Sequence, residues 1–464
     1  MQRILGSVVT AVVLLTGDEY VTDPNASIAR FAMNDSYDSR QQSAPFDVRA
    51  LLAAARGAPP AICLLAARSL PGYGWGNWSD APATPLTGLT TPTAYNFEKG
   101  SLPVADVQFL LESLASDDAC VREISVRLLG RQKGEAVESG LTSRLTASEV
   151  PLREVAAFGL GLAEPPTAVN PLMRALRDAA PGVRANSAWA LGRMEAGRAL
   201  APLMELFRDD AEKVREAAVT AVGRMDSSTA VAALLRVVQQ DKAASVRRVA
   251  AWALGELEAR EAVAVLSAVL SQDTGADVRE MAAWALGSIE DRKASTALAT
   301  AARSDAGERV RETAVWALGE IGDGASVDVL GSIAASDRSS EVRGTAAWAI
   351  GQIRESGKAP AGLVQLLKDE NEETRLKAAW ALGQIGDSTA LPAIKDALRQ
   401  EKNKDVTRAL IRALMKSGEH SESIFKELLD SSDPQVREAA VRGLAGRSSH
   451  NPWPWPWPRP RPFP

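Results

Sequence analysis

Few side chains in this chain could bind a metal or act as nucleophiles. Among its 464 residues are two histidines, His420 and His450, and two cysteines, Cys63 and Cys120. Zinc sites usually need three or four such ligands close together, so these numbers exclude a multi-histidine metal site. They also exclude a disulfide framework, and we expect both cysteines to pack as small apolar residues. The sequence therefore predicts no metal and no cofactor.

Arginine and aspartate recur along the chain at regular spacing. The arginines, which follow one another at intervals of 29–33 residues, are Arg122, Arg153, Arg184, Arg215, Arg247, Arg279, Arg311, Arg343, Arg375, Arg408 and Arg437. The aspartates, each six residues before an Arg, are Asp178, Asp209, Asp241, Asp273, Asp305, Asp337 and Asp369. Such a carboxylate can cap a helix or pair with the Arg of an adjacent repeat. Because it is copied so often, we predict a structural ladder rather than catalysis.

The sequence around these arginines predicts short helices that occur in pairs. Residues 278–287, Val-Arg-Glu-Met-Ala-Ala-Trp-Ala-Leu-Gly, recur with few changes as residues 310–319, 342–351 and 374–383. A second amphipathic stretch, for example residues 262–270, lies between the copies. Apolar residues fall at helical spacing in both stretches, and neither helix can bury its apolar face alone. The repeats must therefore stack on one another.

This repeated sequence resembles the HEAT-like repeats first described in phycobilisome-lyase proteins, over residues 103–447 and about eleven repeats. The resemblance implies an all-α fold, a right-handed α-α superhelix, whose second helices line the concave surface. Gly287 is expected near the end of its helix, where a break or tight packing is needed. The repeat at Arg408 has Ala413 and Lys416 where others have Trp and Gly, which is typical of a C-terminal cap.

Enzymes with related repeats need residues that this chain lacks. Deoxyhypusine hydroxylase resembles this fold but needs several His-Glu pairs for iron, and the one pair here, Glu419-His420, is reversed and solitary. Bilin lyases share the repeat, yet no residue here singles out a bilin site. HEAT-like DNA glycosylases need a basic concave face, whereas this chain has a net charge of -5. We predict a non-catalytic protein that does not bind nucleic acid.

An aromatic residue recurs five positions after the Arg. The tryptophans at this position are Trp189, Trp252, Trp284, Trp316, Trp348 and Trp380; Phe158 holds it in an earlier repeat and Thr220 interrupts the series. At about 100° per residue, this position lies nearly opposite the apolar face of the second helix. Two interpretations stay open: the indoles pack between repeats, or they form a ligand-facing stripe. We favour the stripe, because contiguous exposed aromatic surface usually has a partner.

Glutamates stand one helical turn before the aromatic position, at Glu280 and Glu312. The helix dipole alone could explain acidic residues in a first turn. Together with the tryptophans, however, they predict a surface that suits an extended, Pro-rich or cationic protein ligand. We therefore predict a scaffold or protein–protein interaction module that binds its partner along a Trp-lined concave groove.

The N-terminal region departs from the repeat pattern. In residues 1–20, Arg3 precedes the apolar run Ile4–Leu15, which resembles a secretory signal peptide or anchor; a buried first helix is the alternative. We therefore expect a periplasmic or envelope-associated protein, with a cytoplasmic one as the alternative. Residues 21–102 are expected to hold a partial helix pair, around Val48-Arg49 and Pro60–Leu70, and a Gly/Pro/Thr-rich loop at Pro71–Gly100.

The C-terminal tail, residues 448–464, has proline at every second position, which favours polyproline II. Its aromatic and cationic side chains are Trp453, Trp455, Trp457, Arg459, Arg461 and Phe463. Such a tail looks like a ligand for an aromatic-lined groove, in its own or a neighbouring molecule. Contact with a membrane, self-assembly in the cell envelope, or a disordered terminus of biased composition are the alternatives.

Overall fold

The computed structural model describes residues 47–59, 63, 102–225, 227–353, 357–418, 422–431 and 434–444. The expected signal segment 1–20, the loop 71–100, the pair Glu419-His420, His450 and the tail 448–464 lie outside the described residues. The chain divides into two compact parts, Met1–Leu51 and Leu52–Pro464. Helix α2 (Val48–Ala55) crosses this boundary, and all later helices belong to the second part.

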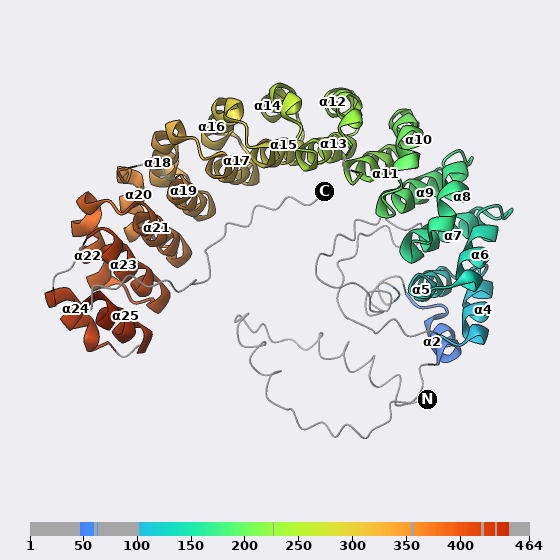
Figure 1. The fold of residues 1–464 in the computed structure, drawn as a ribbon, viewed down its shortest axis with the longest axis horizontal. Helices are drawn as coiled ribbons and strands as arrows, with labels where there is room; N and C mark the ends of the chain where they lie inside the picture. The colour runs from blue at the N-terminus through green and yellow to red at the C-terminus, as the bar shows by residue number, and fades with distance from the viewer. Residues whose placement is uncertain are drawn as a thin grey trace, which may run out of the picture. The chain divides into compact units, whose positions relative to one another are not determined.

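Eleven helix pairs follow one another in the described residues of the second part (Figure 1). The first helices are α4 (Val104–Ser113), α6 (Glu135–Arg144), α8 (Val169–Ala175), α10 (Leu200–Glu205), α12 (Val231–Gln240), α14 (Val263–Gln272), α16 (Ser295–Ser304), α18 (Val327–Ser336), α20 (Ala361–Gln365), α22 (Leu391–Gln400) and α24 (Glu422–Leu429). The second helices are α5 (Ala119–Leu129), α7 (Val150–Ala163), α9 (Pro181–Arg193), α11 (Glu212–Gly223), α13 (Ala244–Glu256), α15 (Ala276–Ile289), α17 (Glu308–Ile321), α19 (Ser340–Gln352), α21 (Glu372–Ile385), α23 (Lys404–Lys416) and α25 (Pro434–Leu444).

Short 3₁₀ turns border most of the middle first helices. They are η1 (Pro166–Ala168), η2 (Gly197–Ala199), η3 (Leu206–Arg208), η4 (Ser228–Ala230), η5 (Arg260–Ala262), η6 (Arg292–Ala294), η7 (Gly324–Ser326), η8 (Leu366–Lys368) and η9 (Ser388–Ala390). No strand occurs in the part of the chain that the structure describes. None of its described helices is long and apolar enough to cross a membrane.

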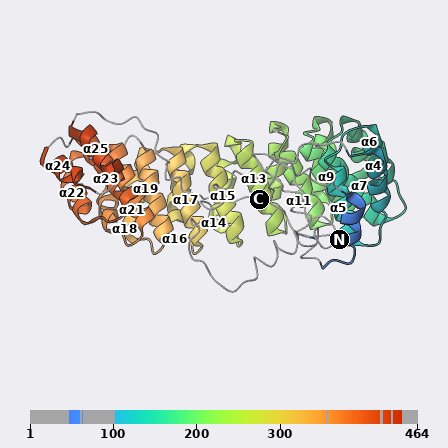
Figure 2. The ribbon, with the colours of Figure 1, turned by 90° about the horizontal axis from the view of Figure 1, so that it is seen from below.

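The helix pairs form two layers. Each second helix packs against those of the adjacent repeats, as α15 does against α13 and α17, and against a first helix, as α17 does against α16. The second helices lie on the inner side of the curve that the repeats describe, and the first helices lie on its outer side (Figure 1). Seen from below, successive repeats stand side by side along the stack (Figure 2). The predicted all-α solenoid of about eleven pairs is therefore confirmed.

Close approach of the second helices depends on small residues. Gly287 lies inside α15, so its role is tight packing rather than a helix break. A Cβ on Gly287 would lie 2.8 Å from Trp316 Cζ3 and 3.0 Å from Ala317 Cα of the next repeat. The core on the other side of α17 contains Val310, Ala314 and Leu318, all buried. Burying a side chain such as Val or Leu stabilises a fold by about 1.5–3 kcal/mol.

The two cysteines form a disulfide bond, which corrects the expectation that they pack as separate apolar residues. Cys63 and Cys120 are joined with their Cα atoms 5.5 Å apart, and both are buried. The bond connects residues 57 positions apart. It fastens a segment that precedes the first helix pair to α5, the second helix of that pair.

Candidate functional site

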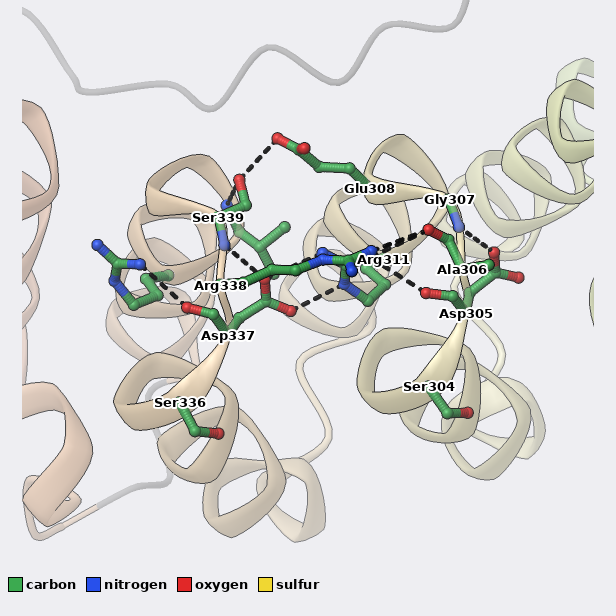
Figure 3. A network of polar contacts seen from close by, with 12 residues as sticks. Ser304, Asp305, Ala306, Gly307, Glu308, Arg311, Ser336, Asp337, Arg338 and Ser339 are labelled. Atoms are coloured by element: carbon green, nitrogen blue, oxygen red, sulfur yellow. Dashed lines mark hydrogen bonds and ion pairs between the residues drawn. The ribbon is translucent and has the colours of Figure 1, made fainter.

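Eight of the recurring arginines, from Arg153 to Arg375, each connect two repeats. Arg311 donates through Nε and Nη2 to the carboxylate of Asp337, at 2.9 and 3.1 Å, and through Nη1 to the carbonyl of Asp305 at 3.1 Å (Figure 3). Asp305 in turn accepts from the Gly307 N–H at 2.8 Å and pairs with Arg279 of the preceding repeat. Of the two roles that the sequence left open, the carboxylate therefore pairs with a neighbouring Arg. It fixes the turn before α17 but does not cap that helix, whose N-cap is Gly307.

The same pairing recurs through the middle of the chain. The pairs are Arg153–Asp178, Arg184–Asp209, Arg215–Asp241, Arg247–Asp273, Arg279–Asp305, Arg311–Asp337, Arg343–Asp369 and Arg375–Glu401. The hydrogen bond from Arg153 is the largest cause that lowers the pKa of Asp178. All three guanidinium nitrogens of Arg311 bond to protein oxygens. The ladder thus serves the stack rather than a substrate.

A narrow stripe of partly exposed residues remains on the second helices. Between Val310 and Ile321 of α17, the half-buried side chains are Glu312, Trp316 and Glu320, and the others are buried. A spacing of four places these three on one helical face, opposite the face that carries Val310. That face is the one that packing of α17 against α15, α16 and α19 leaves partly exposed.

Equivalent positions on neighbouring helices continue this surface, which we call the inner stripe. It comprises Glu216 and Thr220 on α11, with Arg224 as its C-cap; Arg248 and Glu256 on α13; Trp284 and Ser288 on α15; Glu312, Trp316 and Glu320 on α17; Gln352 on α19; and Leu376, Trp380 and Gln384 on α21. Its chemistry changes along the chain. On α11 and α13 acidic and basic residues alternate, whereas from α15 to α21 the accessible charges are the two carboxylates of α17.

The tryptophans pack between repeats at every position of the series. Trp189, Trp252, Trp284, Trp316, Trp348 and Trp380 each direct Cζ3 at a glycine of the preceding repeat, as Trp316 does at Gly287. Trp189 and Trp252 are 4% exposed and Trp348 only 1%. Trp284, Trp316 and Trp380 are half-buried. The expected row of open indole faces is therefore corrected to a packed ladder in which three of the six keep accessible surface.

At the N-terminal end of the aromatic series, arginines of the chain itself already lie over the aromatic rings. Phe158, which is buried, stacks on Trp189 with ring centroids 5.0 Å apart. The guanidinium of Arg193 lies 5.3 Å from the centroid of Trp189, and Arg193 also pairs with Glu164. Arg127 lies over Phe158 at 5.8 Å. Phe158 and Trp189 are thus covered by the protein's own residues.

The two glutamates that the sequence singled out have different surroundings. Glu280 is 4% exposed and pairs with Arg309 at 2.8 Å, so its charge is already neutralised. Burial raises its pKa, and Arg309 opposes that effect. Glu312 is half-buried and accepts a hydrogen bond from Thr345 Oγ1 at 3.4 Å. Burial raises the pKa of Glu312 and the carboxylate of Glu341 raises it further, while Lys377 and the hydrogen bond from Thr345 lower it in part.

A third glutamate, Glu320, escaped sequence reasoning. It stands one turn after Trp316 and bonds to the side chain of that residue. Burial raises its pKa, and nearby Glu290 adds to the effect. The signal in the sequence was the acidic residue four positions after a tryptophan, which Glu256 repeats after Trp252. Among the described residues, no three His, Cys, Asp or Glu side chains are placed to hold a metal ion.

Comparisons with known proteins agree with this architecture. The family described as HEAT repeats matches residues 138–223, 207–287, 231–319, 263–351, 327–415 and 359–445, more than half of the chain. No curated protein matches. The structure of importin beta in an ammonium sulfate condition is similar at 15% identity and a TM-score of 0.56, covering 74% of this chain and 57% of importin beta.

Two further structures match with lower TM-scores. An engineered protein is 21% identical, with 73% of this chain and 98% of that protein covered and a TM-score of 0.40. The complex of CpcE and CpcF of phycocyanin lyase from Nostoc sp. PCC7120 is 20% identical, with 55% and 95% covered and a TM-score of 0.33. Identities at this level bear on the fold alone.

Proposed function

The chain belongs to the HEAT-repeat family, and from this premise we propose that it is a non-catalytic scaffold. Its ligand, on this proposal, is an extended, cationic and Pro-rich segment of a protein. The segment lies along the inner stripe from α15 to α21. Beyond their exposed first turns, the second helices in this part of the stack keep partly accessible side chains along the stripe.

The main observation behind this proposal is the pair of carboxylates beside Trp316. Glu312 and Glu320 lie one turn before and one turn after a half-buried indole, and burial raises the pKa of both carboxyls. A carboxylate that has lost water without gaining a full countercharge binds a cation more strongly than an exposed one does. An Arg or Lys of a ligand could contact the indole and pair with either carboxylate at once.

The chain itself supplies a precedent for this mode of contact. Arg193 lies over Trp189 and pairs with Glu164, so one guanidinium meets an aromatic face and a carboxylate together. Arg193 stands four residues after its tryptophan, and Glu320 occupies the equivalent position after Trp316. At this position α17 therefore carries a carboxylate, where α9 carries the guanidinium of Arg193. The repeat at Trp316 would take its cation from a partner.

The spacing of the second helices suits a polyproline II ligand. Such a segment presents the same face every three residues, about 9 Å, and packed helices lie about 8–10 Å apart. Every third side chain of the ligand could therefore contact the next second helix along the stack. Ser288, Gln352 and Gln384 are available to form hydrogen bonds with the carbonyls or side chains of the ligand. The tail residues Trp453 to Arg461 have this composition, so the tail is our proposed occupant, in its own or a neighbouring molecule.

Binding of the tail in trans tests the proposal. A fluorescent peptide with the sequence of residues 451–464 is titrated into a chain that lacks those residues. The variant Glu312→Gln/Glu320→Gln should bind at least tenfold more weakly, since each charged hydrogen bond contributes about 1.5–3 kcal/mol. Glu261→Gln, on the outer side at η5, is the matched control and should leave the affinity unchanged. Equal affinity for all three proteins would refute the assignment of the stripe.

A further inference from the structure

Helix α5 is the second helix of the first pair. Its side chains are buried as fully as those of second helices in the middle of the array. In α5 the buried residues are Cys120, Val121, Glu123, Ile124, Ser125, Val126, Leu128 and Leu129. Among the described residues, the one complete helix before this pair is α2. At the opposite end, α25 leaves Val441 55% and Leu444 39% exposed. Helix α5 is therefore covered at the N-terminal end of the array, whereas Val104 at the start of α4 is 78% exposed. The residues that cover α5 have to be identified.

Two attachments hold the preceding segment at the N-terminus of α5. The first is the disulfide between Cys63 and Cys120. The second is Asp118, the N-cap of α5, whose carboxylate accepts from the N–H groups of Cys120 and Val121 and from the N–H of Gly57 at 2.6 Å. The bond from Gly57 is the largest cause that lowers the pKa of Asp118. A covalent bond and a charged hydrogen bond thus meet within one helical turn.

The attached segment also buries apolar surface. Leu52 and Ala55 of α2 are buried, as are both cysteines. Stacked-repeat proteins need terminal caps, because a terminal repeat otherwise exposes the face that an interior repeat buries. From these observations we infer that residues 52–59, together with Cys63, act as an end cap of the array, which the Cys63–Cys120 disulfide holds in place and which is released when the disulfide is reduced.

The chemistry of release is a two-electron exchange. A dithiol reductant such as dithiothreitol attacks one sulfur of the bond, and its second thiol completes the exchange. The S–S bond is broken, Cys63 and Cys120 each gain a hydrogen as free thiols, and the reductant becomes a disulfide. The polar contacts that the structure gives between the segment and the array are then the Gly57–Asp118 hydrogen bond and the exposed Arg56–Asp117 ion pair at 4.0 Å. Without the covalent bond, one hydrogen bond, one exposed ion pair and the burial of Leu52 and Ala55 must offset the conformational entropy of the segment, so we expect the segment to open more often.

Limited trypsin digestion at Arg56 tests the inference, because this exposed residue lies in the cap directly before Gly57. In the oxidised full chain, cleavage after Arg56 should be slow. Dithiothreitol should accelerate it at least about tenfold, since cleavage follows the free energy of local opening. The variant Cys63→Ser/Cys120→Ser should be cleaved at the fast rate with or without reductant. Hydrogen exchange in α15 should be the same in all samples, which shows that the array stays folded.

Asp118→Asn separates the two attachments. With the disulfide intact, this variant should keep slow cleavage to within about twofold, because a neutral amide oxygen still accepts hydrogen bonds. The inference fails if reduction leaves cleavage after Arg56 unchanged. It also fails if Asp118→Asn alone gives the fast rate in the oxidised protein, because the hydrogen bond and not the disulfide would then be the lock.

Discussion

Trp316 joins two repeats through contact with Gly287 and keeps part of its indole accessible between Glu312 and Glu320. The choice between packing and binding, which the sequence left open, is therefore not exclusive at this residue. Trp348 occupies the same position in the next repeat and is 1% exposed. The same residue type thus has different exposure in adjacent repeats, because its cover comes from neighbouring helices.

Substitution of the two tryptophans should separate packing from surface exposure. Trp348→Ala removes a buried indole and should lower the free energy of unfolding by about 3–5 kcal/mol. Trp316→Ala, at a half-buried position, should cost less, about 2 kcal/mol. Urea denaturation of both variants measures the difference. If Trp316→Ala proves as costly as Trp348→Ala, the indole of Trp316 serves packing alone.

The glycine beneath each indole should resist substitution. In Gly287→Ala the new Cβ would lie 2.8 Å from Trp316 Cζ3 and 3.0 Å from the backbone at Ala317. We expect a net loss of about 1–2 kcal/mol, since overpacking outweighs the higher helix propensity of alanine. Gly197→Ala is the control, because nothing lies within 4 Å of its Cβ and its stability should change by less than about 0.5 kcal/mol. Equal stability of both variants would contradict the packing argument.

The raised pKa of Glu312 predicts a pH dependence of stability. A carboxyl whose pKa is higher in the folded than in the unfolded state disfavours folding when it is ionised. That cost is relieved as the pH falls through the folded pKa, and it disappears below the unfolded value of about 4.3. Glu312→Gln should therefore be more stable than the parent at pH 7, with an advantage that shrinks on acidification. A constant difference between pH 7 and pH 4.5 would contradict the burial of this carboxyl.

At the scale of elements, the Arg–Asp ladder connects the loops that precede successive second helices. Arg311 and Asp337 are nearly buried, with side-chain exposures of 4% and 8%. The sequence predicted a structural ladder, because the positions of both residues repeat in register, and it offered this pairing beside helix capping. It could not predict that Glu401 replaces the aspartate as the partner of Arg375, since Glu401 does not match the recurring residue type.

Breaking one buried Arg–Asp pair of the ladder should lower the free energy of unfolding far more than removing an exposed carboxylate. Asp337→Asn leaves the guanidinium of Arg311 buried without its countercharge, and we expect a loss of about 3 kcal/mol. Asp277→Asn, in the exposed first turn of α15, should cost less than about 1 kcal/mol. Thermal unfolding of both variants measures the contrast. Similar melting temperatures would show that the ladder adds little to the stability of the stack.

At the scale of the whole molecule, the helix-pair architecture could be predicted and the attachment of its N-terminal end could not. The eleven pairs follow from periodicity, because each repeat carries the same apolar spacing. Cys63 lies outside that periodic pattern and 57 residues from Cys120, so no spacing rule joins them. A buried disulfide is typical of oxidising compartments. It therefore supports our proposal that the chain is exported, which the apolar run Ile4–Leu15 first suggested.

The position of the bound tail tests the central proposal most directly. A photo-reactive amino acid replaces Ser288 or Gln352 in the inner stripe, or Ser267 on α14 of the outer layer, in a chain that lacks residues 451–464. Each protein is irradiated with the tail peptide, and the cross-linked product is identified by mass spectrometry. We predict cross-links from Ser288 and Gln352 and none from Ser267. Cross-linking from Ser267 alone, or bound peptide without cross-links from either stripe position, would contradict the account.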